Sequence, residues 1–133
     1  MIILTQVLEH LRDPSKLVVQ LRKLLDLTGV VLLALPNENT LFHRIRFLFG
    51  KGVDDQTLSP DKHLHFPTIQ QSDTFVGKYF VILEKRYHMD YCGRVKRFIS
   101  WIPRRWLAFL ANVYPQLFAR TVIYLCRPLC DAS

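Results

Sequence analysis

The sequence lacks the features that define several classes of small protein. Its three cysteines form neither an even disulfide framework nor a C-x-x-C pair, which favours free thiols in a reducing compartment and a cytoplasmic protein. The apolar start of the chain is too short for a signal peptide. The uncharged stretch 106–119 has only 14 residues, too few for a membrane-spanning helix. Without internal repeats, residues 1–133 predict a single domain.

Acidic side chains are scarce in the last part of the chain. Residues 1–93 hold 11 basic and 10 acidic side chains, whereas residues 94–133 hold 7 basic and 1 acidic. Nearly all of the formal charge of +7 therefore comes from the C-terminal segment. Any anionic partner is expected there.

The first 37 residues predict a βαβ unit. Residues 1–5 form a short β-branched run that starts abruptly, as if sequence preceded it. Asp13-Pro14 is a strong helix start, and Gly29 is expected as a left-handed cap after the helix. The continuously apolar run 30–35 then predicts a strand buried on both faces.

The remaining elements alternate between helices and strands. Residues 40–49 predict an amphipathic helix, followed by a polar loop over residues 53–62 that is either a surface excursion or a lid. Thr68 and Gln71 form a capping box before a short helix that Gly77 is expected to end. Further elements are predicted as a strand at 79–87, helices within 94–120 broken by prolines, and a strand at 119–126.

Two segments together resemble the class I S-adenosylmethionine-dependent methyltransferases. They are V-L-E-H-L-R-D-P at residues 7–14 and L-R-K-L-L-D-L-T-G-V-V-L-L-A-L-P-N at residues 21–37. Residues 63–68 and 120–127 are similar to the family's late helix start and last strand. The resemblance implies an α/β fold with strands four to seven of a Rossmann-like sheet, the last strand antiparallel. It also implies helices on both faces and a helical insert at residues 94–118.

The resemblance also implies what is missing. The family binds its cofactor with a Gly-rich turn after strand one and an acidic residue after strand two. None of the five glycines lies in such a turn. Thr5, Gln6 and Val7 match positions that border S-adenosylmethionine, so they supply only part of its site. The missing half, or a protein partner, is expected at the edge of the first strand.

Glu9 and His10 are candidates for the substrate side of the site. Some family members that methylate catechol-like oxygens carry E-x-x-E-H here and hold a divalent metal. Gln6 replaces the first carboxylate, and a neutral amide is a weaker ligand for a hard cation, so no metal is expected. The alternative is that Glu9 and His10 only pack or cap the turn before the helix.

Three further polar residues are candidates. His63 and His65 point the same way in an extended segment, and one of them could serve as a general base for an acceptor hydroxyl. The alternative is a pair of surface histidines. Asn37 follows a buried strand, where α/β sheets place substrate-binding groups, but Pro-Asn is also ordinary turn chemistry.

The basic, aromatic segment 94–127 leaves three interpretations open. It is a helical cap over the acceptor site, a peripheral contact with an anionic membrane, or a helix pair with its arginines outward. No nucleic-acid module motif is present, so no nucleic-acid partner is expected. The sequence thus predicts a methyltransferase that is incompetent in this chain alone, with methyl transfer to a small or lipid-like acceptor in the complete form. The alternative function is a non-catalytic remnant or binding module.

Overall fold

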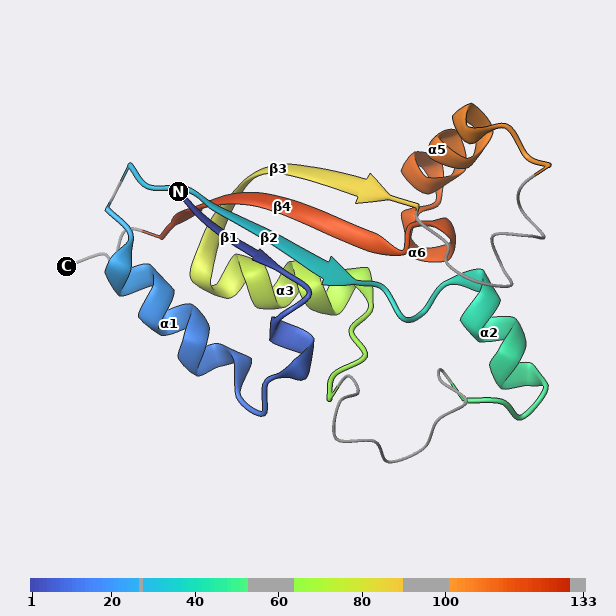
Figure 1. Cartoon of the computed structure of the whole chain (residues 1–133), viewed down its shortest axis with the longest axis horizontal. Helices are drawn as coiled ribbons and strands as arrows, with labels where there is room; N and C mark the ends of the chain where they lie inside the picture. The colour runs from blue at the N-terminus through green and yellow to red at the C-terminus, as the bar shows by residue number, and fades with distance from the viewer. Residues whose placement is uncertain (27, 53–63, 90–100, 130–133) are drawn as a thin grey trace.

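The computed structural model describes residues 1–26, 28–52, 64–89 and 101–129 (Figure 1). Strands and helices alternate along the described chain, which confirms the predicted α/β class. In chain order, the elements are β1 (Ile2–Thr5), η1 (Leu8–His10), α1 (Pro14–Leu24), β2 (Val31–Pro36), α2 (Leu41–Leu48), α3 (Ile69–Tyr79), β3 (Phe80–His88), α5 (Arg104–Val113), α6 (Pro115–Phe118) and β4 (Thr121–Pro128).

The four strands form one open, mixed sheet in the order β1-β2-β4-β3. β1 runs parallel to β2, with Ile2 opposite Val31. β4 lies between β2 and β3 and is antiparallel to both, which is the direction expected for the last strand. The register of β3 shifts between Ile82 and Glu84, a β-bulge that lets one extra residue into this outer strand.

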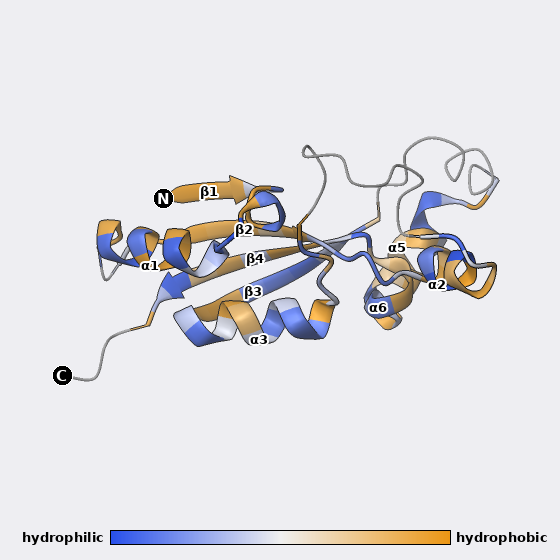
Figure 2. Cartoon of the chain, turned by 90° about the horizontal axis from the view of Figure 1, so that it is seen from below, coloured by the Kyte–Doolittle hydropathy of each residue, from blue (hydrophilic) through white to orange (hydrophobic). Residues whose placement is uncertain are grey.

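Helices α1 and α3 contact each other and lie on the same face of the sheet (Figures 1 and 2). The expectation of helices on both faces is therefore wrong for the described residues. The path of the chain explains the difference. From β1 to β2, and from β2 to β3, it moves in the same direction across the sheet between parallel strands. Two right-handed crossovers in the same direction place their helices on the same face.

The hydrophobic core lies between this face and the two helices. Alternate residues of β2 and β4 point into it, and Val31, Leu33, Val122 and Tyr124 are each at most 1% exposed. Further members come from the helices and from the start of β3, namely Val18, Val76 and Phe80. The opposite face carries Ile3, Val81 and Leu83, which are all about half exposed.

Local signals set most helix ends correctly and fail at two glycines. The Asp13 carboxylate accepts a hydrogen bond from Lys16 N, and Thr68 and Gln71 form the expected capping box. Gly29 has no positive φ, so it is not the expected left-handed cap. α3 continues past Gly77 to Tyr79, because an exposed glycine costs only about 1 kcal/mol and the continued turn packs the ring of Tyr79 against that of Phe75.

The predicted helical insert is described from residue 101 onward. Pro115 separates the short helix α6 from α5, as expected, and α5 begins directly after Pro103. A second buried cluster of Ile69, Ala111 and Ala119 attaches these helices to the rest of the fold. Residues 94–100 and the polar loop 53–62 lie outside the described residues.

Candidate functional site

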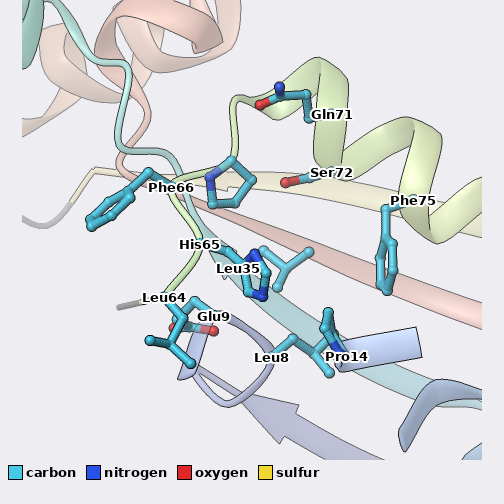
Figure 3. A pocket seen from close by; sticks show the side chains of 11 residues that line it. Leu8, Glu9, Pro14, Leu35, Leu64, His65, Phe66, Gln71, Ser72 and Phe75 are labelled. Carbon is cyan, nitrogen blue, oxygen red and sulfur yellow. The ribbon is translucent and has the colours of Figure 1, made fainter. Parts of the chain in front are cut away.

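A cavity of about 450 Å³ lies beside the carboxyl end of β2 (Figure 3). Three segments that are distant in sequence form its walls: η1 with the start of α1, residues 64–67, and the first turns of α3. Its lining residues are Leu8, Glu9, Pro14, Leu35, Leu64, His65, Phe66, Pro67, Gln71, Ser72 and Phe75. A mostly apolar wall with a few polar groups is typical of small-molecule sites.

Hydrogen bonds of the main chain hold two of these segments together. The Glu9 carbonyl accepts hydrogen bonds from Leu64 N at 2.8 Å and His65 N at 3.1 Å. His65 Nε2 donates to the Leu11 carbonyl at 2.9 Å. These contacts fix residues 64 and 65 against η1, so the candidate residues Glu9 and His65 line one cavity.

Glu9 is the most unusual polar residue of the cavity. The residue is only 1% exposed, and neither carboxylate oxygen has a hydrogen-bond partner among the residues that the structure describes. A buried carboxylate without a partner costs several kcal/mol, and a ligand that donates a hydrogen bond or carries a positive charge would recover part of this. Glu9 therefore packs in the turn before α1, as the alternative interpretation predicted. Among the described residues, its side chain caps no backbone group.

His65 offers one nitrogen for chemistry. Because a carbonyl only accepts, Nε2 must carry the proton in its bond to Leu11, which leaves Nδ1 as the atom that can accept a proton. An imidazole in this tautomer can act as a general base. His63, its predicted companion, lies outside the described residues.

The predicted cofactor-side residues lie at the carboxyl end of β1, outside the cavity lining. Thr5, Gln6 and Val7 are all exposed. Gln6 has a φ of 54°, in the left-handed region that residues other than glycine rarely adopt. Such strain costs about 1–3 kcal/mol and is concentrated at functional sites. The edge of β1 here has no strand partner on its outer side among the described residues.

Asn37 and His10 do not reach the cavity. The Asn37 amide Nδ2 donates to the carbonyls of Gln116 at 3.1 Å and Ala119 at 2.8 Å, and its Oδ1 accepts from Asn39 N. Asn37 is 1% exposed and ties β2 to α6. These hydrogen bonds give Asn37 the turn role that Pro-Asn also predicted, and a substrate-side role for it stays a prediction. His10 is exposed at the end of η1.

Sequence reasoning missed the part of the cavity that α3 supplies. Gln71, Ser72 and Phe75 share one helix face, and the capping box already placed Gln71 in the first turn. That face could have been identified from the spacing of these residues, but not what it faces. Outside the cavity lining, the hydroxyl of Tyr124 donates to Asp73 Oδ1 at 2.8 Å, and Lys85 Nζ donates to both Asp73 oxygens.

The structure describes one of the three cysteines. Cys126 is a free thiol, fully buried in β4, and burial raises its pKa to about 12, which makes it inert at neutral pH. Cys92 and Cys130 lie outside the described residues. Among the residues that the structure describes, no three histidine, cysteine or acidic side chains are grouped as a metal site would require.

Comparisons with known proteins leave the family open. No protein-family model matches this chain, and no curated protein matches it. The function must therefore be argued from the sequence resemblance and the geometry of the site.

Proposed function

We propose that this chain is the C-terminal half of a class I methyltransferase-like domain, which in complete form transfers a methyl group from S-adenosylmethionine to a small or lipid-like acceptor. One observation carries the proposal. The sheet is mixed, and its last strand is antiparallel to both neighbours, as the resemblance requires for strands four to seven. The V-L-E-H segment then follows the carboxyl end of β1, where α/β sheets bind their ligands.

The residues present fit the cofactor only in part. Thr5, Gln6 and Val7 are exposed at the carboxyl end of β1 and would form one wall of its site. The strained backbone at Gln6 supports a functional role for this turn. The sequence contains no Gly-rich turn that would form the opposite wall. We therefore expect no tight cofactor binding by the chain alone.

The outer edge of β1 is where the second wall would attach. Ile3 is 57% exposed on the open face of the sheet, and the outer side of β1 has no strand partner among the described residues. An unpaired edge with apolar side chains invites a further strand. The Gly-rich half, from the same gene or a partner chain, would add its strands at this edge.

The cavity of Glu9 and His65 is the proposed acceptor site. Its apolar residues would bury the body of the acceptor, and the Glu9 carboxylate would accept a hydrogen bond from its hydroxyl or amine. His65 Nδ1 would remove a proton from a hydroxyl as it becomes a nucleophile. Orientation of the two reactants would supply most of the remaining catalysis.

The test is calorimetric titration with S-adenosylhomocysteine of two proteins. One is the 133-residue chain, and the other is the longest product that its gene encodes in frame with Met1. We expect no binding by the chain and micromolar binding by a longer product with a Gly-rich turn. In the longer product, Gln6→Pro should weaken binding, whereas the control Gln20→Ala, at an exposed position, should leave it unchanged. Micromolar binding by the chain alone would contradict the inference that half of the cofactor site is missing from it. A folded longer product that does not bind would overturn the methyltransferase assignment.

The other expectations on function stay predictions. A non-catalytic binding module remains the alternative, and it requires no cofactor. A cytoplasmic location also stays a prediction. Among the described residues, no helix is long and apolar enough to cross a membrane.

A further inference from the structure

Helices α2, α5 and α6 gather at one end of the molecule, beyond the carboxyl end of β2 (Figures 1 and 2). We call the surface formed by residues 41–52 and 101–114 the aromatic end. Large apolar side chains are exposed there to an unusual degree. Leu48 is 84% exposed, Trp101 80% and Phe49 76%. Exposed apolar surface on this scale marks an interaction site rather than ordinary surface.

Helix α5 is apolar on its outer face as well as its inner face. On the inner face, Ala111 is 1% exposed and belongs to the cluster with Ile69 and Ala119. On the outer face, Trp106, Phe109 and Val113 follow at spacings of three and four residues and are each about half exposed. The rings of Trp106 and Phe109 meet edge to face at 6.3 Å. A helix that is apolar on both faces requires a cover on the outer one.

Helix α2 also exposes its large apolar side chains, but the residue that it buries is polar. Its His43 is 8% exposed and points inward, where Nδ1 lies 3.2 Å from the Thr40 hydroxyl oxygen. Phe47, Leu48 and Phe49 lie in the exposed last turn. Gly50, with a φ of 67°, then reverses the chain.

The charge of this end has one sign. Residues 41–52 and 101–114 contain five basic side chains and no acidic one: Arg44, Arg46, Lys51, Arg104 and Arg105. All of them are exposed except Arg46, which is partly buried. Each basic residue near an anionic lipid surface is worth about 1 kcal/mol of attraction.

We propose that the aromatic end docks onto an anionic lipid bilayer, with α2 and α5 lying in the interface. Exposed tryptophan and phenylalanine beside arginine, on helices with a separate inner face, is the composition of interfacial helices. The basic charge complements acidic headgroups. This surface goes beyond the segment expected from sequence, because it includes α2. It involves neither the cavity nor the cofactor wall, so it stands or falls separately from the methyltransferase proposal.

The test is flotation of the purified chain with vesicles of phosphatidylcholine alone or of phosphatidylcholine mixed with phosphatidylglycerol. We expect flotation with the mixed vesicles only, and a decrease as salt screens the charges. Arg104→Glu combined with Arg105→Glu should weaken binding by about tenfold or more. Trp106→Ser combined with Phe109→Ser should abolish it.

The matched control is Val81→Ser combined with Leu83→Ser, which removes two apolar side chains that are also about half exposed, from β3. Far-ultraviolet circular dichroism should be the same for all variants. Equal flotation with both vesicle types, or equal loss in the control, would overturn the proposal. So would self-association, measured by sedimentation without lipid, that the Trp106 and Phe109 variant abolishes, because the cover would then be a second copy of the chain.

Discussion

On the covered face of the sheet, Val31, Val122 and Phe80 are at most 1% exposed, whereas Leu48 and Phe49 at the aromatic end are 84% and 76% exposed. The two regions use the same residue types. What differs is whether the chain supplies a second layer. Helices α1 and α3 form that layer over β2 and β4, and no described element covers the outer faces of α2 and α5. Apolar composition thus predicts that a surface is to be buried, but not which element or partner buries it.

The largest effect should come from breaking the covered face. Phe80→Ala should lower the free energy of unfolding by about 3–5 kcal/mol, because it leaves a cavity in a packed core. Phe49→Ala should change it by less than about 0.5 kcal/mol, because the ring is already in water. Urea unfolding followed by far-ultraviolet circular dichroism measures both. Similar losses in the two variants would contradict the difference between the regions.

A smaller effect is expected at the residue that connects the two regions. Asn37 is buried and holds the carbonyls of Gln116 and Ala119. Asn37→Ala should cost about 1–3 kcal/mol, because those buried carbonyls lose their donor. The control is Asn112→Ala, since Asn112 is exposed and donates to Ala108 within its own helix. Equal urea midpoints for the two variants would show that Asn37 does not make this connection.

The smallest effect concerns the inner side of α2. Burial lowers the pKa of His43 below its ordinary value of 6.5, although the charge of Glu38 opposes the change. The unfolded chain then takes up the proton more readily than the folded one. The contribution of His43 to the free energy of unfolding is therefore fully present above about pH 6.5. It is lost as the pH falls towards the lower pKa of the folded state.

The measurement is the free energy of unfolding at several pH values between about 7 and 5. His43→Gln should reduce the fall in this free energy as the pH is lowered, compared with the wild-type chain. An unchanged slope in His43→Gln would mean that this side chain titrates alike in both states.

The sequence predicted the elements whose signals are local. Asp13-Pro14 and the pair Thr68 and Gln71 gave correct helix starts, and the apolar run 30–35 gave β2 to within one residue. Gly77 misled because a glycine signal was outweighed by packing between aromatic rings one turn apart. Local patterns are weak where tertiary contacts decide.

The arrangement of the site depended on contacts that are distant in sequence. Glu9 and His65 were separate candidates, and only the hydrogen bonds from residues 64 and 65 to the Glu9 carbonyl bring them into one cavity. Asn37 had two compatible interpretations, and its contacts with residues 116 and 119 supply the structural one. No spacing along the chain could have supplied these partners, because they depend on how the strands pair.

The placement of the tryptophans has a practical consequence for spectroscopy. The chain has two, Trp101 and Trp106, and both are exposed at the aromatic end, at 80% and 55%. The core of the sheet contains phenylalanine and tyrosine instead. Emission excited selectively at tryptophan therefore reports the surroundings of one end of the molecule and changes little when the sheet unfolds. A fluorescence trace and a dichroism trace of the same sample would thus describe two different parts of the protein.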